Sequence, residues 1–153
     1  MKLYRQLSGG RRWRFLDTAF TNQRTLSSFR FRTRAKANAS YRVVFGGNRR
    51  LERSRNATSV SVYRTFSARL KDGTGRFHGR VRPHYAHRSI HLEKRACARC
   101  DWNVVRTHMT GDHGRYHFKL GAPRHGRSFW RLQTPPSNRY IRSYSGVFST
   151  ERN

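Results

Sequence analysis

The chain has 153 residues, of which 34 are Lys or Arg and only seven are Asp or Glu, so its formal net charge is +27. Such a charge attracts nucleic acids, anionic polymers and anionic membrane surfaces at low salt. No apolar run is long enough to span a bilayer, and the few scattered carboxylates form no recognisable acid–base pair, which argues against an enzyme.

Only five of the basic residues are lysine, and all the others are arginine. Arginine codons are GC-rich, so genome composition is an alternative source of the charge to selection for a polyanionic partner. The arginines are spread along the whole chain and do not gather in a tail. From the sequence, both explanations of the charge stay open.

Short apolar–polar alternations separated by turn signals predict strands along the whole chain. In chain order, strands are expected around Leu3, Trp13–Phe15, Phe29–Phe31, Tyr41–Phe45, Ser59–Tyr63, Phe66–Leu70, Phe77–Val81, Ile90–Leu92, Trp102–Thr110, Tyr116–Leu120, Phe129–Gln133 and Tyr140–Phe148. Turns are expected at Thr21–Thr25 and Lys71–Gly75. No segment carries apolar residues at helical spacing over a helical length, so we expect an all-β protein of the sandwich type.

Two stretches of the chain match without a gap at an offset of 89 residues. Identical pairs at this offset include Leu3/Leu92, Trp13/Trp102, Thr18/Thr107, Thr21/Thr110, Phe29/Phe118, Arg42/Arg131, Arg50/Arg139, Arg53/Arg142 and Ser54/Ser143. The offset is too long for a solenoid unit and suits a small sandwich. The sequence therefore predicts two tandem small Ig-like β-sandwich domains, over residues 1–64 and 65–150.

The first domain is expected to be incomplete, because it has no counterpart of the hairpin predicted over residues 66–81. We interpret this as a chain without its natural N-terminus, or as a domain completed by strands of another chain. An open sandwich exposes apolar surface and an unpaired edge. The first domain should therefore be the less stable and the more association-prone of the two.

Apolar residues that alternate and recur at the offset predict the framework of both cores. They are Leu3, Trp13, Phe29, Tyr41, Val43, Leu92, Trp102, Tyr116, Phe118, Trp130 and Leu132. The aromatic members could instead form a base-stacking platform between arginines. Their alternation and recurrence favour a buried core.

Six groups of core and turn residues carry a resemblance to a known family. They are Phe77-x-Gly79-x-Val81-x-Pro83, Ile90-x-Leu92, Trp102-x-Val104-Val105, Thr110-x3-Gly114-x-Tyr116-x-Phe118, Phe129-Trp130-Arg131 and Tyr140-x2-Ser143. With them, residues 74–149 resemble the Ig-like or prealbumin-like repeats of actinobacterial secreted proteins, close to carboxypeptidase-regulatory-like domains. The resemblance implies stalks, spacers or adhesive domains at the cell surface, within a longer parent chain.

Cys97 and Cys100 are the only cysteines, and two residues separate them in a Cys-x-x-Cys pair. The plainest interpretation is a local disulfide in the loop between the strands at Leu92 and Trp102. Free thiols and half of a zinc site are the alternatives, but no second such pair exists. All eight histidines lie in the second half, and His113-x3-His117 is only a weak metal signal. We predict no metal, no cofactor and no catalytic residue.

These features favour a non-catalytic structural or adhesive module of a secreted or cell-surface protein. Its basic face would attract an anionic cell-wall polymer or another polyanion. The sequence begins without a signal peptide, and a cytoplasmic location is the alternative. The alternative function is a basic nucleic-acid-binding protein of the ribosome-associated type, in which arginines contact phosphates.

Overall fold

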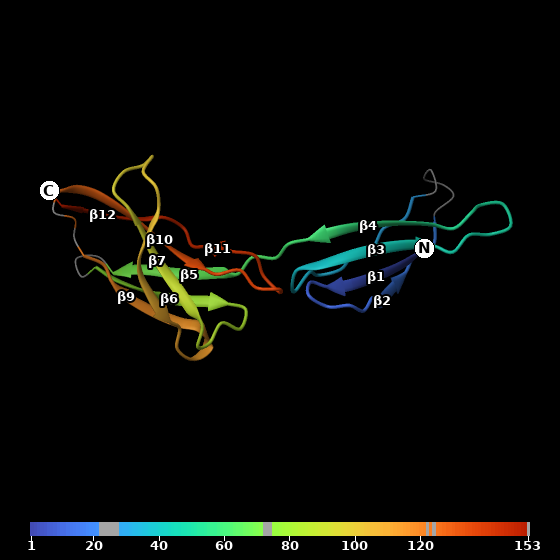
Figure 1. Cartoon of the computed structure of the whole chain (residues 1–153), viewed down its shortest axis with the longest axis horizontal. Helices are drawn as coiled ribbons and strands as arrows, with labels where there is room; N and C mark the ends of the chain where they lie inside the picture. Colours follow the sequence, from blue (N-terminus) through green and yellow to red (C-terminus); the bar gives the residue numbers. More distant parts are fainter. Residues whose placement is uncertain (22–27, 72–74, 122, 124, 153) are drawn as a thin grey trace. The chain divides into compact units, whose positions relative to one another are not determined.

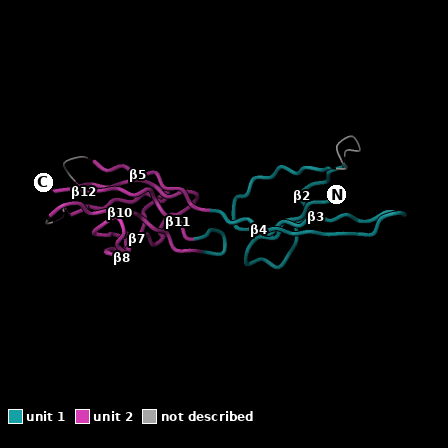
Figure 2. Tube along the Cα trace, turned by 90° about the horizontal axis from the view of Figure 1, so that it is seen from above, with its two compact units in different colours: residues 1–62, 137–141 teal, residues 63–136, 142–153 magenta. Residues whose placement is uncertain are grey.

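In the computed structural model the described residues are 1–21, 28–71, 75–121, 123 and 125–152. They form an all-β protein with three antiparallel sheets (Figure 1). Within these ranges there is no α-helix, only the 3-10 turn η1 (Asp112–Gly114). No helix in the described part of the chain is long and apolar enough to cross a membrane. The chain divides into two compact units, residues 1–62 with 137–141 and residues 63–136 with 142–153 (Figure 2).

Unit 1 contains one sheet with the strand order β2-β1-β3-β4. Its strands are β1 (Lys2–Leu7), β2 (Arg14–Thr18), β3 (Ala39–Phe45) and β4 (Ser54–Val60). Only Leu3, Ala39 and Tyr41 form its buried apolar cluster, with Leu16, Phe31, Val43 and Val60 packed against them. One face of this sheet therefore carries a small core.

Unit 2 contains two sheets. The first has the order β11-β10-β7-β8, with β12 also paired to β10, and the second has the order β5-β6-β9. Their strands are β5 (Thr65–Lys71), β6 (Arg76–Arg82), β7 (Ser89–Arg95), β8 (Asn103–Met109), β9 (Arg115–Lys119), β10 (Gly126–Thr134), β11 (Ser143–Tyr144) and β12 (Phe148–Arg152).

The two sheets of unit 2 share one apolar core, which makes the unit sandwich-like. Its buried members come from both sheets and are Phe77, Val81, Tyr85, Ile90, Leu92, Tyr116, Phe118, Leu120, Trp130 and Leu132. Gly79 in β6 allows a close approach here, because a Cβ at this position would lie 1.8 Å from the Ser67 carbonyl oxygen and 2.6 Å from the Tyr116 hydroxyl. That hydroxyl donates a hydrogen bond to the same carbonyl at 2.8 Å.

The strands β2-β1-β3 of unit 1 and β8-β7-β10 of unit 2 have the same order and register at the offset of 89 residues. Leu3 pairs with Val43 as Leu92 pairs with Leu132. The pairing of β1 with β2 shifts between Leu3 and Tyr4, and that of β7 with β8 shifts at the equivalent step after Leu92. A bulge is a local feature of the backbone. Its occurrence at the same step in both sheets shows that the strand pairing matches residue by residue there.

The segment Ser137–Ile141 belongs to unit 1, although it follows β10 in the sequence. Pro135 and Pro136 lie directly after β10, and proline lacks the N–H that a paired strand needs. In unit 1 the Arg139 carbonyl accepts a hydrogen bond from the Asn38 N–H at 2.8 Å, and the buried Tyr140 donates its hydroxyl to the Lys36 carbonyl at 3.1 Å. Unit 1 is thus built from two separate stretches of chain.

Three strand predictions differ from the structure. Phe29–Phe31 is not in a strand, and the strand expected over Ser59–Tyr63 lies earlier, at β4. Nearly all of β4 is exposed, so its sequence has no apolar alternation to reveal it. Tyr140–Phe148 was predicted as one strand, and the structure has β11 and β12. The predicted turns over Thr21–Thr25 and Lys71–Gly75 fall mostly on residues outside the described ranges.

Burial also corrects the predicted core. Seven of the framework residues are buried: Leu3, Tyr41, Leu92, Tyr116, Phe118, Trp130 and Leu132. Trp13, Val43 and Trp102 are half-buried. The prediction of a buried Phe29 is wrong, because its side chain is 41% exposed. The described part of unit 1 has no second sheet to cover it.

We expect the amides of β1 and β3 to exchange with solvent faster than those of β7 and β10. The physical reason is that unit 1 has the smaller buried cluster. Amides exchange through local opening, and opening costs less free energy where fewer apolar contacts must break. Native-state hydrogen exchange followed by mass spectrometry measures both sets in one sample. Equal protection of the two pairs of strands would contradict the expectation.

Candidate functional site

The outer face of the β11-β10-β7-β8 sheet carries alternating arginine and aromatic side chains. Side chains alternate along a strand, and in β10 the buried Trp130 and Leu132 face the core while Phe129 and Arg131 face outward. We call the outward set the ladder and define it as Phe129, Arg95, Trp102, Arg131 and Tyr144.

Each arginine of the ladder lies between two aromatic rings. The Arg95 guanidinium carbon is 5.2 Å from the Phe129 ring centroid and 4.6 Å from that of Trp102. The Arg131 guanidinium carbon is 4.3 Å from the Trp102 centroid and 4.1 Å from that of Tyr144. Each guanidinium group thus contacts two aromatic rings, a favourable arrangement for a weakly hydrated planar cation.

Glu93 fixes the centre of the ladder from the neighbouring strand. Its carboxylate accepts a hydrogen bond from Arg131 Nε at 2.5 Å, and the two side chains are only 10% and 21% exposed. A carboxylate this deeply buried needs its partner, because the uncompensated charge would be costly. The pair therefore holds Arg131 in place between Trp102 and Tyr144.

Unit 1 carries a shorter version of the same arrangement. The Arg42 guanidinium carbon is 4.3 Å from the Trp13 ring centroid and 5.8 Å from that of Tyr4. Arg42 and Trp13 match Arg131 and Trp102 at the offset of 89 residues. Tyr4 stands where unit 2 has Glu93, so here an aromatic ring replaces the buried carboxylate.

The ladder corrects the interpretation of two tryptophans and adds residues that the sequence analysis missed. Trp13 and Trp102 lie against arginine on the outer face and not in the sandwich core. The available signal was the identity of Arg42 and Arg131 at the offset, which the sequence analysis recorded without assigning them a role. Arg95 has no such signal, because its counterpart in unit 1 is a glutamine.

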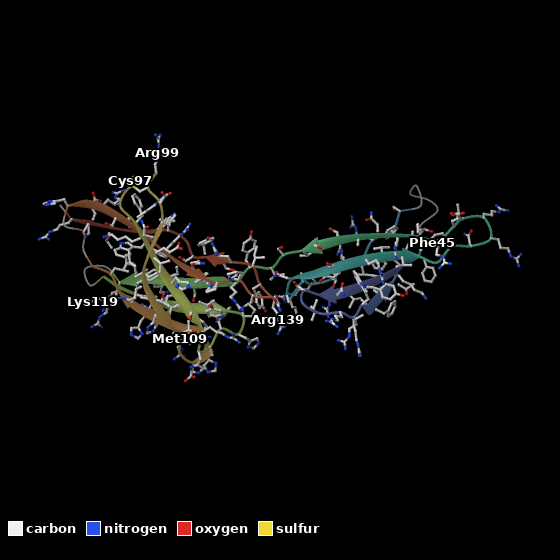
Figure 3. The ribbon with its side chains drawn as sticks, viewed as in Figure 1. Phe45, Cys97, Arg99, Met109, Lys119 and Arg139 are labelled. Carbon is white, nitrogen blue, oxygen red and sulfur yellow. A yellow bond between two sulfur atoms is a disulfide. The ribbon has the colours of Figure 1, made fainter. Side chains whose placement is uncertain are left out.

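The cysteine pair lies in the loop between β7 and β8, where Figure 3 shows Cys97 beside the outward-pointing Arg99. The two sulfur atoms are 2.15 Å apart, a disulfide. In the described ranges, no group of three or more His, Cys, Asp or Glu side chains could hold a metal ion. His113 lies in η1, whereas the His117 ring packs edge-on against His108 at a centroid distance of 5.6 Å.

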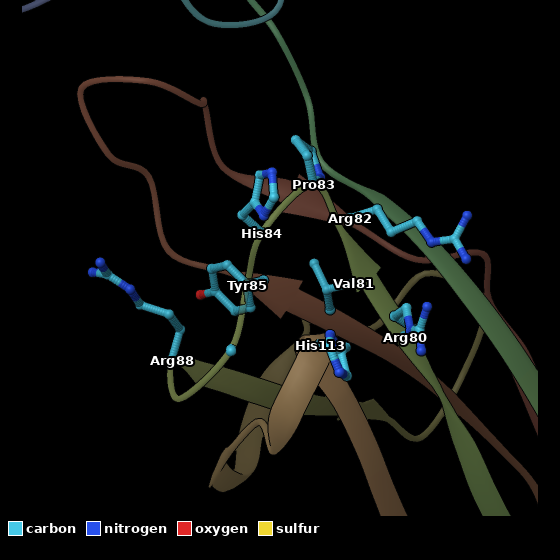
Figure 4. Close-up of a pocket in the computed structure, with 9 residues that line it drawn as sticks. Arg80, Val81, Arg82, Pro83, His84, Tyr85, Arg88 and His113 are labelled. Atoms are coloured by element: carbon cyan, nitrogen blue, oxygen red, sulfur yellow. The ribbon is translucent and has the colours of Figure 1, made fainter.

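A basic pocket of about 550 Å³ lies at the end of β6. It is lined by Arg80, Val81, Arg82, Pro83, His84, Tyr85, Ala86, Arg88 and His113. Figure 4 shows that the guanidinium groups of Arg80 and Arg82 point to one side and that of Arg88 to the other. The pocket is therefore a region of positive charge, and these arginines do not converge on one anion.

Tyr85 forms the wall of this pocket. Burial raises the pKa of its hydroxyl, while the nearby Arg64 and Arg88 act in the opposite direction. The hydroxyl donates to the Ser89 carbonyl at 2.5 Å, and the Arg64 guanidinium carbon is 4.5 Å from the ring centroid. These contacts give Tyr85 a structural role in the loop between β6 and β7.

Comparisons with known proteins add no identification. No protein-family model matches the chain, and no curated protein matches it. The function must therefore be inferred from the residues and the structure.

Replacing Arg131 by methionine should destabilise unit 2 by about 3–5 kcal/mol, because Glu93 would remain buried without its partner. Chemical denaturation followed by circular dichroism measures the effect. Arg127→Met is the matched control, since Arg127 and Glu151 are about half exposed and such a pair contributes roughly 0–1 kcal/mol. Equal losses in the two variants would contradict a structural role for the buried pair.

Two tyrosines of unit 2 should deprotonate above the ordinary tyrosine pKa of about 10. Burial raises the pKa of Tyr116, and it raises that of Tyr85. The pKa of each of these tyrosines is higher in the folded state than in the unfolded state. Their contribution to the free energy of unfolding is therefore complete below pH about 10 and is lost as the pH rises further. Ultraviolet absorbance during a pH titration checks this, with Tyr116→Phe removing one late step. An unchanged titration curve in the Tyr116→Phe variant above pH about 10 would contradict it.

Proposed function

We propose that the chain consists of two tandem copies of one β-sandwich module. Support comes from the shared strand order, register and bulge of the β2-β1-β3 and β8-β7-β10 strands. The Arg42–Trp13 and Arg131–Trp102 stacks add side-chain detail to the same correspondence. The second copy includes the covering strands β5, β6 and β9, and the described residues of the first copy include no counterpart of β5 or β6.

The module is proposed to be a non-catalytic structural or adhesive domain of a secreted or cell-surface protein. A disulfide persists in oxidising compartments, and Cys97–Cys100 supports that location. The resemblance to Ig-like or prealbumin-like repeats of secreted proteins points the same way. The ladder further supports a structural role, because its arginine and aromatic side chains contact each other and Arg131 also pairs with Glu93.

The binding activity proposed for the module is sequence-independent attraction to an anionic polymer. The observation that carries it is the charge balance: seven carboxylates can neutralise at most seven of the 34 basic side chains. Glu93 and Glu151 are already engaged with Arg131 and Arg127. A surplus of this size creates a strong positive potential along the whole surface.

The ladder also bears on the nucleic-acid alternative. Binding of single-stranded nucleic acid without sequence preference relies on aromatic rings that stack on bases. Arginine guanidinium groups already lie over the rings of Trp13 and Trp102. Phosphate contacts remain open to the exposed arginines, so the arrangement favours recognition of negative charge over stacking on bases.

Heparin, a sulfated model polyanion, tests this function directly. Its affinity for the protein should fall linearly on a log–log plot against salt. A protein that makes six to ten charge contacts loses roughly 10³–10⁵ in affinity between 50 and 200 mM salt. Titration calorimetry or fluorescence at several salt concentrations gives the slope.

Two results of the same series separate the candidates. Affinity that does not change with salt would rule out the polyanion role. Poly(A) and poly(U) of matched length serve as controls, because attraction to charge alone gives them similar affinities. A strong preference for one of them would favour the nucleic-acid alternative.

A further inference from the structure

The inner face of the unit 1 sheet carries an apolar groove of about 690 Å³. Its lining includes the sheet residues Leu3, Tyr41 and Val43 and the side chains of Phe29 and Phe31. The groove thus lies on the face of the sheet that bears the small core of this unit.

Unit 2 shows what covers the same face when the sandwich is complete. The counterparts of Leu3, Tyr41 and Val43 at the offset are Leu92, Trp130 and Leu132, and all three are buried under the β5-β6-β9 sheet. Phe118 in β9 is 3% exposed, whereas its counterpart Phe29 is 41% exposed. Among its described residues, unit 1 has no counterpart of the β5 and β6 hairpin that supplies this cover in unit 2.

The segment from Phe29 to Ala35 forms one edge of the groove. Residues at alternate positions (Phe29, Phe31, Thr33 and Ala35) line the groove, and the residues between them (Arg30, Arg32 and Arg34) are exposed. No described strand pairs with this segment. In unit 2 the equivalent strand β9 pairs with β6, where Phe77 lies opposite Phe118. A backbone edge that no described strand pairs with, beside an apolar groove, is suited to the addition of a strand from another chain.

Charge indicates which kind of chain fits. Residues 1–62 contain fifteen Lys and Arg and only two carboxylates, Asp17 and Glu52. A second copy of this protein would bring another +27 of charge, and such like charges repel. An acidic segment would instead pair with Arg30, Arg32 and Arg34 along the edge of the groove.

We propose that the unit 1 groove binds an amphipathic β-hairpin of a different polypeptide, apolar on the side that enters the groove and acidic on the other. One strand of the hairpin pairs with the segment from Phe29 to Ala35, and its apolar side chains cover Leu3, Tyr41 and Val43. This proposal is independent of polyanion binding, which needs only the exposed charge and neither the groove nor the segment.

The test uses the full chain and a head-to-tail cyclised, fluorescently labelled peptide with the sequence of residues 65–82. Its outward basic side chains are made acidic by the changes Arg69→Glu, Lys71→Glu, Arg76→Glu, Arg80→Glu and Arg82→Glu. Fluorescence anisotropy should show saturable binding. Hydrogen exchange should show new protection in the stretches around Leu3 and Phe31 and unchanged protection in β7.

Matched variants locate the site. Phe29→Asp should weaken binding of the acidic hairpin by at least about tenfold, or 1.4 kcal/mol. Phe20→Asp should leave binding unchanged, because Phe20 is in the same unit, is 89% exposed and does not line the groove. Circular dichroism of both variants confirms that each retains the fold.

Matched peptides separate apolar recognition from simple charge attraction. The hairpin with its original basic residues should bind at least about tenfold more weakly. The acidic hairpin with Phe77→Ser should also lose at least about tenfold, because this change removes apolar surface without altering the charge.

Four results would overturn the proposal. They are no saturable binding of the acidic hairpin, equal binding to the Phe29→Asp variant, undiminished binding of the Phe77→Ser hairpin, and self-association of the full chain that Phe29→Asp abolishes. Analytical ultracentrifugation measures the last of these, which would make a second copy the occupant. If the protein binds the acidic hairpin but does not bind heparin, only the proposed polyanion function is contradicted.

Discussion

An antiparallel sheet with one apolar face is stable in water only when that face is covered. Unit 2 meets this constraint with the β5-β6-β9 sheet, which brings Phe77 and Val81 onto Leu92 and Leu132. Unit 1 has three strands of the same order and register, and Phe31 packs against their small buried cluster. The difference in core size, the exposure of Phe29 and the groove all follow from this one difference in covering.

The outer face of each sheet is covered in another way, by arginine and aromatic side chains that pack on each other. In unit 2 this arrangement joins Trp102, Arg131 and Tyr144, and it surrounds the buried carboxylate of Glu93. Long arginine side chains can cover apolar surface while their charged ends reach water or a ring face. Part of the arginine content of this chain is therefore structural. The exposed remainder is the basis for the proposed attraction to polyanions.

The sequence analysis predicted the all-β class, most strands and the Cys97–Cys100 pair, because alternation and close spacing are local signals. The position of β4 was wrong, because its exposed polar residues carry no alternation. Phe29 was expected to be buried because it alternates with arginines and recurs as Phe118 at the offset. Burial of a side chain on one sheet depends on which strand packs over it. The sequence around Phe29 does not indicate that strand. The ladder was missed for a similar reason, since the contact of Arg95 with Trp102 depends on how two strands pair.

The apolar face of the sheet is covered in unit 2 and open in unit 1, and thiol labelling compares the exposure of equivalent positions in the two units. Cys97 and Cys100 are joined, so Phe29→Cys and Phe118→Cys each introduce one free thiol. The rate of alkylation by iodoacetamide under native conditions measures the access of the reagent to each thiol. We expect rapid labelling at position 29, and labelling at position 118 only when unit 2 unfolds. Equal rates at the two positions would contradict it.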